Sequence, residues 1–297
     1  MTIPWYLVVP FVAAGLYASA SLFFKRAYAN GLGTLDAFYW MNLVGLVIFT
    51  PLFLTVREWP ALTEWWKPAL TASLIFGGTW TTFAAIRAGD VSLVTPLMGT
   101  KVVFTALVAA GWAGTQLPVG LWVAAVLTTV GILILGWRDL RRGQGKRRAV
   151  LLCLVSALVF ASADVLIGQW ARDFGRAAFL GTVFGMIGVV SLIMVRWHAP
   201  RAFRVAVAAR RDLALGAGLM NLNTLAMGLV IASSNDPAGV NIVYGTRGLW
   251  SIALVWFFGR RWFGNEERHS AGDTMGRRLA GSVLILAAVG AAVGGRS

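Results

Sequence analysis

The sequence predicts an all-α integral membrane protein whose ten transmembrane helices form two inverted five-helix repeats. Two observations predict the membrane class. The 297-residue chain is 58% hydrophobic and only 13% charged, which is about half the charged fraction of an ordinary soluble domain. Its apolar residues also lie in long runs of the length, about 20 residues, that a helix needs to cross a bilayer.

Ten apolar runs follow one another along the chain, separated by short polar connections. Helix is the expected conformation of each, because a span inside lipid must satisfy its own backbone hydrogen bonds. The short alternating segments of a transmembrane barrel do not occur. The runs cover residues 5–24, 37–56, 68–86, 91–112, 117–137, 149–171, 177–195, 213–232, 237–258 and 279–295.

The longest basic connection divides the chain near its middle. Residues 138–148 read Arg-Asp-Leu-Arg-Arg-Gly-Gln-Gly-Lys-Arg-Arg. We therefore expect a first five-helix repeat at 1–140, a basic connecting loop at 141–148 and a second five-helix repeat at 149–297. Two complete halves would let one chain hold a whole binding site, so a monomer and a homodimer are both compatible with the sequence.

An internal repeat supports this division. Sliding the second half back by 146 residues aligns Gly99-Thr100-Lys101 with Gly245-Thr246-Arg247. In the first run of each half, Tyr17-Ala18-Ser19-Ala20 resembles Phe160-Ala161-Ser162-Ala163. Each half holds an odd number of spans, so the two halves must lie in the membrane with opposite topology. In proteins built this way, the substrate site lies near the midplane between the repeats.

The net charge of +14 comes mostly from short loops between the apolar runs. Nineteen lysines and arginines lie in the loops after runs one, three, five, seven and nine, against five in the other loops and the termini. The positive-inside rule then predicts that both termini lie outside. Charges placed in this way argue against a nucleic-acid partner. The lipid bilayer of the cell (inner) membrane is the expected location of this multi-pass chain.

Three strongly ionisable residues lie within the apolar runs: Lys101, Asp164 and Arg247. An isolated charge at the bilayer centre costs about 3 kcal/mol, so each should face a partner or a water-filled cavity. Lys101 and Arg247 occupy equivalent mid-depth positions, and we expect them on opposite walls of one cavity, where they would bind an anionic group. Alternatively, one cation pairs permanently with Asp164 and fastens two helices. Asp164 could also be a proton-coupling group.

Further candidates for substrate binding lie close to these charges. Residues three or four positions from a charge share its helical face and predict aromatic walls with a few hydroxyls, although helix packing is the plain alternative for each aromatic. Two asparagines in the eighth run point to different faces, and one should bond a neighbouring helix. These candidates are Tyr244, Trp250, Phe104, Thr105, Ser251, Asn221 and Asn223.

Two stretches within this five-plus-five pattern carry a family resemblance. Residues 88–97 read Ala-Gly-Asp-Val-Ser-Leu-Val-Thr-Pro-Leu, and residues 130–136 read Val-Gly-Ile-Leu-Ile-Leu-Gly. Together with the two-half organisation, they resemble the EamA-like branch of the drug/metabolite transporter superfamily. One departure is Gly114-Thr115-Gln116, where the family often has a Gly-Glu pair. The resemblance implies that both termini lie in the cytoplasm, the reverse of the charge count.

The expected function is secondary active transport of a small organic anion or zwitterion by alternating access. Such a substrate would be a carboxylate- or phosphate-bearing metabolite or an amino acid. No Walker motif is present, and neither a cofactor nor a metal is expected, since the chain has one cysteine, Cys153, and two histidines outside the apolar runs. A flippase for a lipid-linked metabolite is the alternative. A membrane-embedded transferase is less favoured, and its candidate groups are His269, Glu266, Glu267 and Asp273.

Overall fold

The computed structural model describes residues 5–88, 97–112, 114, 116–141, 147–198, 205–234, 236–247, 249–250, 253–254 and 257, with isolated positions between 280 and 291. These residues are helical apart from short connections, and they contain no strand. The α-helices are α1 (Trp5–Ala29), α2 (Thr34–Phe49), α3 (Trp66–Ala88), α5 (Lys101–Gly111), α6 (Val119–Arg141), α7 (Arg147–Phe174), α8 (Arg176–His198), α9 (Val207–Ser234) and α10 (Pro237–Tyr244). The 3-10 helices are η1 (Thr50–Thr55), η2 (Leu62–Glu64) and η3 (Met98–Thr100).

Within these ranges, five helical stretches are long and apolar enough to cross a membrane, and two shorter apolar helices accompany them. This agrees with an all-α membrane protein, while the count of ten spans stays a prediction. The five stretches are Tyr6–Ala29, Thr34–Thr55, Arg147–Phe174, Arg176–Arg196 and Val207–Ser234, and the shorter helices are Met98–Gly111 and Val119–Gly131.

Several helix ends depart from the predicted runs, and charged residues account for two of them. α1 continues past residue 24 through Lys25 and Arg26, whose long side chains can reach the polar boundary while their stems stay apolar. α7 begins at Arg147, inside the predicted connecting loop. The second run ends in η1, where Pro51 lacks the N–H that an α-helix would use.

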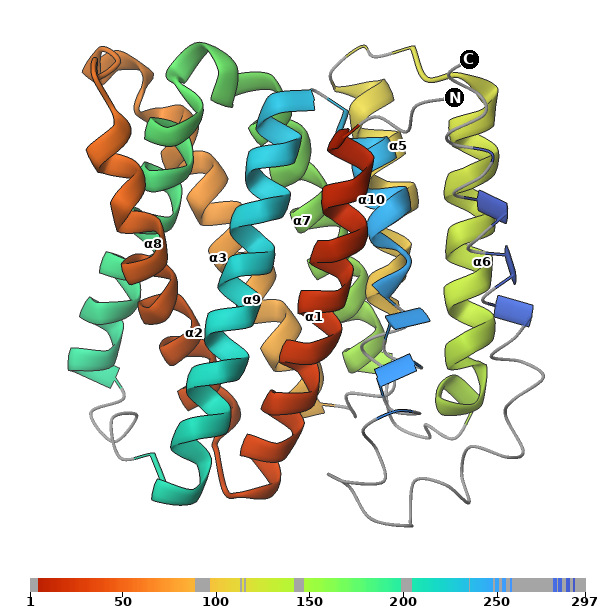
Figure 1. Ribbon diagram of the computed structural model, residues 1–297, viewed down its shortest axis with the longest axis horizontal. Helices are drawn as coiled ribbons and strands as arrows, with labels where there is room; N and C mark the ends of the chain where they lie inside the picture. Colours follow the sequence, from red (N-terminus) through yellow and green to blue (C-terminus); the bar gives the residue numbers. More distant parts are fainter. Residues whose placement is uncertain are drawn as a thin grey trace.

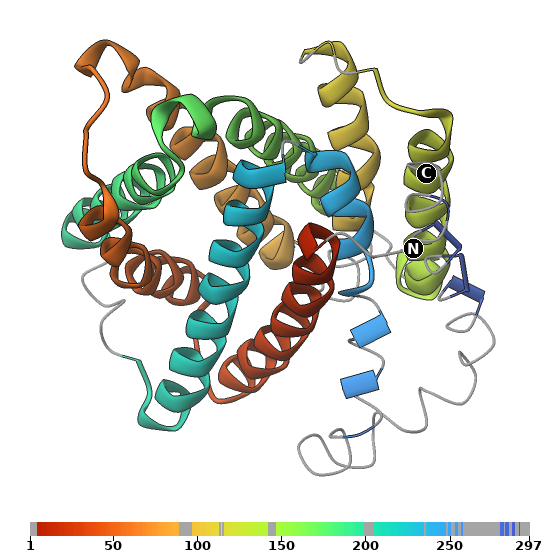
Figure 2. The ribbon, with the colours of Figure 1, turned by 45° about the horizontal axis from the view of Figure 1, so that its top comes forward.

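Eight of the described helices form a closed ring in which each packs against the next. The order around the ring is α1, α9, α2, α8, α3, α7, α5, α10 and back to α1 (Figure 2). Exchanging α1 with α7, α2 with α8, α3 with α9 and α5 with α10 leaves the eight neighbouring pairs around the ring the same, and α7 packs in addition against α8 and α9. α6 lies to one side, against α5 and α10. The packing of the ring therefore repeats itself between the two halves.

Corresponding helices of the two halves run in opposite directions (Figure 1). α1 begins at the upper end of the view, whereas α7 begins at the lower end, and the pairs α2 and α8, and α3 and α9, are opposed in the same way. Basic residues gather at the lower end, where α1 and α8 end and α7 and α9 begin. They include Lys25, Arg26, Arg147, Arg148, Arg196, Arg210 and Arg211.

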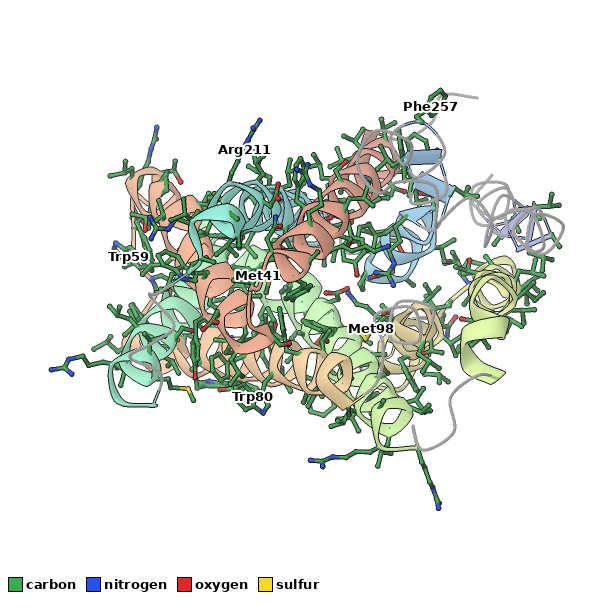
Figure 3. The ribbon with its side chains drawn as sticks, turned by 90° about the horizontal axis from the view of Figure 1, so that it is seen from below. Met41, Trp59, Trp80, Met98, Arg211 and Phe257 are labelled. Carbon is green, nitrogen blue, oxygen red and sulfur yellow. The ribbon has the colours of Figure 1, made fainter. Side chains whose placement is uncertain are left out.

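The view along the helices separates the periphery of the bundle from its interior (Figure 3). Trp59 and Trp80 lie at the outer edge, and Arg211 points away from the bundle. Met41 and Met98 lie inside, and Met98 is 8% exposed. Met98 belongs to η3, immediately before Lys101, so the first of the predicted cations lies on an interior segment.

Candidate functional site

Both repeat-equivalent cations follow a break in an α-helix. η3 immediately precedes Lys101, which is the first residue of α5. α10 ends at Tyr244, and a turn at Gly245 and Thr246 separates it from Arg247. Interrupted helices in membrane proteins expose backbone groups and frequently mark binding sites. The alignment by 146 residues thus joins two positions that also share this local structure.

The two breaks are stabilised by the same hydrogen bond. Thr100 Oγ1 donates to the carbonyl of Leu97 at 2.7 Å, and Thr246 Oγ1 donates to the carbonyl of Val243 at 2.8 Å. In each case the threonine satisfies a carbonyl three residues earlier, as expected for a 3-10 rather than an α-helical turn. The Gly-Thr pair before each cation therefore has a structural role in ending one helical segment.

Gly245 allows the broken helix to approach α6. A Cβ at this position would lie 2.7 Å from Thr128 Cγ2 and 2.9 Å from the carbonyl oxygen of Ile242. Real Cβ atoms do not approach other atoms so closely, and one of the two neighbours is backbone that cannot move independently. A side chain at Gly245 would therefore push α10 away from α6 or change the turn that leads to Arg247.

Lys101 forms an ion pair with Asp164 of α7. Its Nζ lies 2.7 Å from Asp164 Oδ2, and the two side chains are 14% and 12% exposed. Asn241 of α10 donates its Nδ2 to the same oxygen at 2.7 Å, so the carboxylate joins α5, α7 and α10. The Lys101 ammonium also lies 5.7 Å from the ring centroid of Phe160. This contact is the one described by the alternative interpretation, in which one cation pairs with Asp164.

Arg247 lies between two tyrosines. Its Cζ is 5.2 Å from the ring centroid of Tyr17 on α1 and 5.1 Å from that of Tyr244 on α10. The two rings meet edge to face with their centroids 6.0 Å apart. The side chains of Arg247 and of Asn223 on α9 lie near the Tyr244 hydroxyl. Cation–π contacts of this kind contribute about 0.5–2 kcal/mol each and hold a guanidinium without neutralising it.

Each cation lies over an aromatic ring from the other half of the chain. Lys101 lies over Phe160 of the second half, and Arg247 lies over Tyr17 of the first. These two rings are the leading residues of the matching tetrapeptides found in the sequence. Tyr17 is the thirteenth of the 25 residues of α1, and Phe160 is the fourteenth of the 28 residues of α7. Both cation sites therefore lie at mid-depth in the bundle.

The two sites differ in the residue that follows the aromatic by four positions. Four residues after Phe160 lies Asp164, which pairs with Lys101. Four residues after Tyr17 lies Ser21, whose hydroxyl donates to the carbonyl of Tyr17 at 2.9 Å. The first half therefore supplies a neutral side chain where the second half supplies a carboxylate.

Asn241 and Tyr244 connect the two sites along α10. They are three residues apart and so lie on neighbouring positions of one helix face. Asn241 contacts the Lys101–Asp164 pair, and Tyr244 contacts Arg247. The structure thus brings together Lys101, Asp164, Arg247, Tyr244 and Asn223 from the predicted set, with Tyr17, Phe160 and Asn241 added.

The site predicted from the sequence did not include Tyr17, Phe160 or Asn241. Tyr17 and Phe160 were visible as the start of a repeated tetrapeptide. Asn241 had a weaker signal, as an amide one helical turn before Gly245 in an otherwise apolar run.

The other predicted aromatic candidates make packing contacts. Trp250 Nε1 donates to the carbonyl of Phe11 at 3.0 Å, and its ring lies 3.3 Å from the Cβ position of Gly15 on α1. Phe104 packs in the cluster that contains Met98 and Leu97. A role of these two aromatics in substrate binding stays a prediction.

The polar candidates outside the cluster also have local partners. Thr105 Oγ1 donates to the carbonyl of Lys101 at 2.8 Å. Asn221 Nδ2 donates to the carbonyl of Met41 on α2 at 2.9 Å, which confirms that one asparagine of this helix bonds a neighbour. Ser251 lies outside the described residues, as do His269, Glu266, Glu267 and Asp273 of the transferase alternative.

Comparison with known proteins bears on the fold and the family. A solved crystal structure is similar over 97% of this chain and 96% of its own, with a TM-score of 0.72 and 14% sequence identity. That likeness shows a shared fold. A search of curated proteins found no match. The EamA-like transporter family matches residues 3–137, which is nearly the whole of the predicted first repeat. This match confirms the resemblance of the first half of the chain to the EamA-like branch of the drug/metabolite transporter superfamily, and it points to a membrane transporter.

Proposed function

We propose that the protein is a secondary active transporter that moves a small organic anion or zwitterion by alternating access. The observation that carries this proposal is the cluster in which Lys101 and Arg247 follow equivalent helix breaks and lie over aromatic rings of opposite halves. Charged side chains within membrane spans are functional candidates by default, because holding them there is costly.

The proposed architecture has ten transmembrane helices in two inverted repeats, 1–140 and 149–297. It is supported by the ring, whose neighbours are unchanged when the halves are exchanged, and by the opposed directions of corresponding helices. Transporters with inverted repeats bind their substrates at the interface of the repeats, near the midplane. The cluster has that location, and one chain supplies all of its residues.

An anionic or zwitterionic substrate fits the charges of the cluster. Lys101 and Arg247 carry two positive charges, and Asp164 carries one negative charge that is directed at Lys101. A planar guanidinium can bind a carboxylate or phosphate through two parallel hydrogen bonds. Arg247, supported by Tyr17 and Tyr244, is therefore the proposed anchor for the anionic group of the substrate.

Alternating access requires contacts that close one end of the bundle and can open. At the basic end, Arg26 Nε of α1 lies 3.6 Å from Asp212 Oδ2 of α9, and Asn30 Nδ2 donates to the same oxygen at 3.4 Å. The equivalent pair, α7 and α3, meets near the opposite end through Trp170 and Trp66, whose rings lie 5.1 Å apart. An ionic contact thus joins α1 to α9 at the basic end, and an aromatic contact joins α7 to α3 near the opposite end. The positive-inside rule would assign the ionic end to the cytoplasm.

Transport by the reconstituted protein tests this function. Proteoliposomes containing wild type, Lys101→Ala or Arg247→Ala are loaded with radiolabelled carboxylates, amino acids or sugar phosphates, and exchange is followed. We expect transport of at least one anionic or zwitterionic substrate by wild type and a loss of at least about tenfold in Arg247→Ala, since charge-assisted hydrogen bonds are the strong ones. Trp59→Ala, a change at the periphery, serves as the control. Equal transport by wild type and both cation variants would contradict the proposal that Lys101 and Arg247 bind the substrate.

A further inference from the structure

The connection between α2 and α3 exposes large apolar side chains. It comprises residues 50–66, which form η1, a short bend, η2 and the first residue of α3. Leu54 is 88% exposed, Leu62 is 81% exposed and Trp66 is 54% exposed. Large apolar side chains exposed within one short segment indicate a surface that contacts another protein or a membrane. The connection therefore requires an apolar partner.

Aromatic contacts hold this connection in a fixed conformation. Phe53 stacks on Trp59 with the ring centroids 5.6 Å apart, and Trp59 lies 5.9 Å from Trp65. Trp65 Nε1 donates to the carbonyl of Pro60 at 3.3 Å, and its ring meets Phe174 of α7 edge to face. The exposed leucines thus belong to a segment whose backbone is fixed from within and from α7.

The first part of the connection lies directly against α8. A Cβ would lie 3.4 Å from the Phe53 ring at Gly181 and 3.3 Å from it at Gly185, so these two glycines leave the room that the ring occupies. The connection lies at the end of the bundle opposite the basic residues (Figure 1), and Trp59 marks its place at the outer edge (Figure 3). It therefore borders the surface that faces the lipid.

The path of the chain identifies the bilayer as the partner. Thr34–Thr55 is long and apolar enough to cross a membrane, and the sequence predicts that the next span begins at residue 68. A connection between two span ends on one side of the membrane runs along the bilayer surface. Tryptophans and other apolar side chains there meet the boundary between headgroups and acyl chains. Leu54 still belongs to the first of these spans, which places it at this boundary.

The charges of the connection also favour lipid over a charged partner. Arg57 and Lys67 balance Glu58 and Glu64, and Lys67 forms an ion pair with Glu64. A strongly acidic or basic protein surface would find no net charge to bind here. The bilayer boundary accepts both kinds of group, because charged side chains can stay in the headgroup layer while apolar ones enter the acyl chains.

We propose that residues 50–66 form an interfacial membrane anchor in the leaflet opposite the basic end. The two exposed leucines enter the lipid, and Trp66 lies at the level of the headgroups. The anchor ties the start of α3 to the bilayer, at the point where Trp66 contacts Trp170 of α7. This proposal depends on the membrane location of the chain and not on its substrate.

Spin labels at Leu54→Cys and Leu62→Cys test the anchor, in a Cys153→Ala background that removes the single native cysteine. The full chain is reconstituted in nanodiscs at a single copy per disc. Power saturation then measures collisions of each label with oxygen, which concentrates in lipid, and with an anionic chromium complex, which stays in water. Val47→Cys is the lipid reference, because Val47 is 71% exposed within the same span. Asp173→Cys is the water reference, because Asp173 is an exposed charged residue at the same end of the bundle.

We expect the oxygen-to-chromium collision ratio at both leucine positions to exceed that at Asp173→Cys by at least about threefold, because a charged reagent is excluded from an apolar medium. Ratios equal to that of Asp173→Cys would place the connection in water and overturn the anchor. Few collisions with either reagent would also overturn it, since a protein partner would then cover the leucines. Lipid exposure at Leu54 alone would reduce the anchor to the end of the α2 span and contradict the proposal. If one labelled variant does not fold, as judged by circular dichroism, the ratio at the other leucine position decides.

Discussion

The Lys101 and Arg247 sites have the same scaffold and different charge balance. Each cation follows a Gly-Thr break and lies over an aromatic ring of the opposite half. Among the described residues of the two sites, the carboxylate belongs to the Lys101 site, because the position of Asp164 is taken by Ser21 in the other half. The comparison teaches that two equivalent scaffolds can hold one cation in an ion pair and its counterpart between aromatic rings.

The largest expected effect comes from removing the carboxylate. Asp164→Leu leaves Lys101 in the interior without its ion-pair partner and removes one of the two acceptors of Asn241 Nδ2, which should cost about 3–5 kcal/mol of stability. Thermal unfolding in detergent, followed by circular dichroism, measures the loss. Replacing the pair together, in Lys101→Met with Asp164→Leu, should restore most of it, because an apolar pair of similar volume needs no compensation.

Ser21→Ala is the matched variant in the other half. It removes a hydroxyl that bonds only its own helix backbone among the described residues, so we expect a change of less than about 0.5 kcal/mol. Equal destabilisation by Asp164→Leu and Ser21→Ala would show that the two sites do not differ in the way described.

A middle-sized effect is expected at the helix break beside Arg247. Gly245→Ala places a Cβ against Thr128 and the carbonyl of Ile242, and such overpacking costs about 1–3 kcal/mol. Gly218→Ala is the control on α9, since a Cβ there meets nothing within 4 Å. That variant should be neutral or slightly more stable, because alanine favours helix. A Gly245→Ala protein as stable as Gly218→Ala would mean that the break does not need glycine.

Much of this comparison could be predicted from the sequence, and part of it could not. Lys101 and Arg247 stand out because charges are rare in apolar runs, and the repeat places them at equal depth. The sequence did not decide which cation pairs with Asp164, because that depends on how α5, α7 and α10 are rotated against one another. The same holds for Trp250 and Phe104, which share a helix with a cation in the sequence pattern and yet pack against Gly15 and the Met98 cluster.

The central claim is that a carboxylate neutralises Lys101, whereas a serine at the equivalent position lets Arg247 bind an anionic ligand. Ser21→Asp tests it directly by giving the first half the carboxylate of the second. We expect this variant to bind the anionic or zwitterionic substrate found in the reconstitution assay at least about tenfold more weakly than wild type, since the introduced carboxylate would compete for Arg247 as Asp164 does for Lys101. Ser21→Asn, which introduces the same shape without the charge, should stay within about threefold of wild type, because an amide does not pair with a guanidinium as strongly as a carboxylate does. A Ser21→Asp protein that binds this substrate as tightly as wild type would contradict the account.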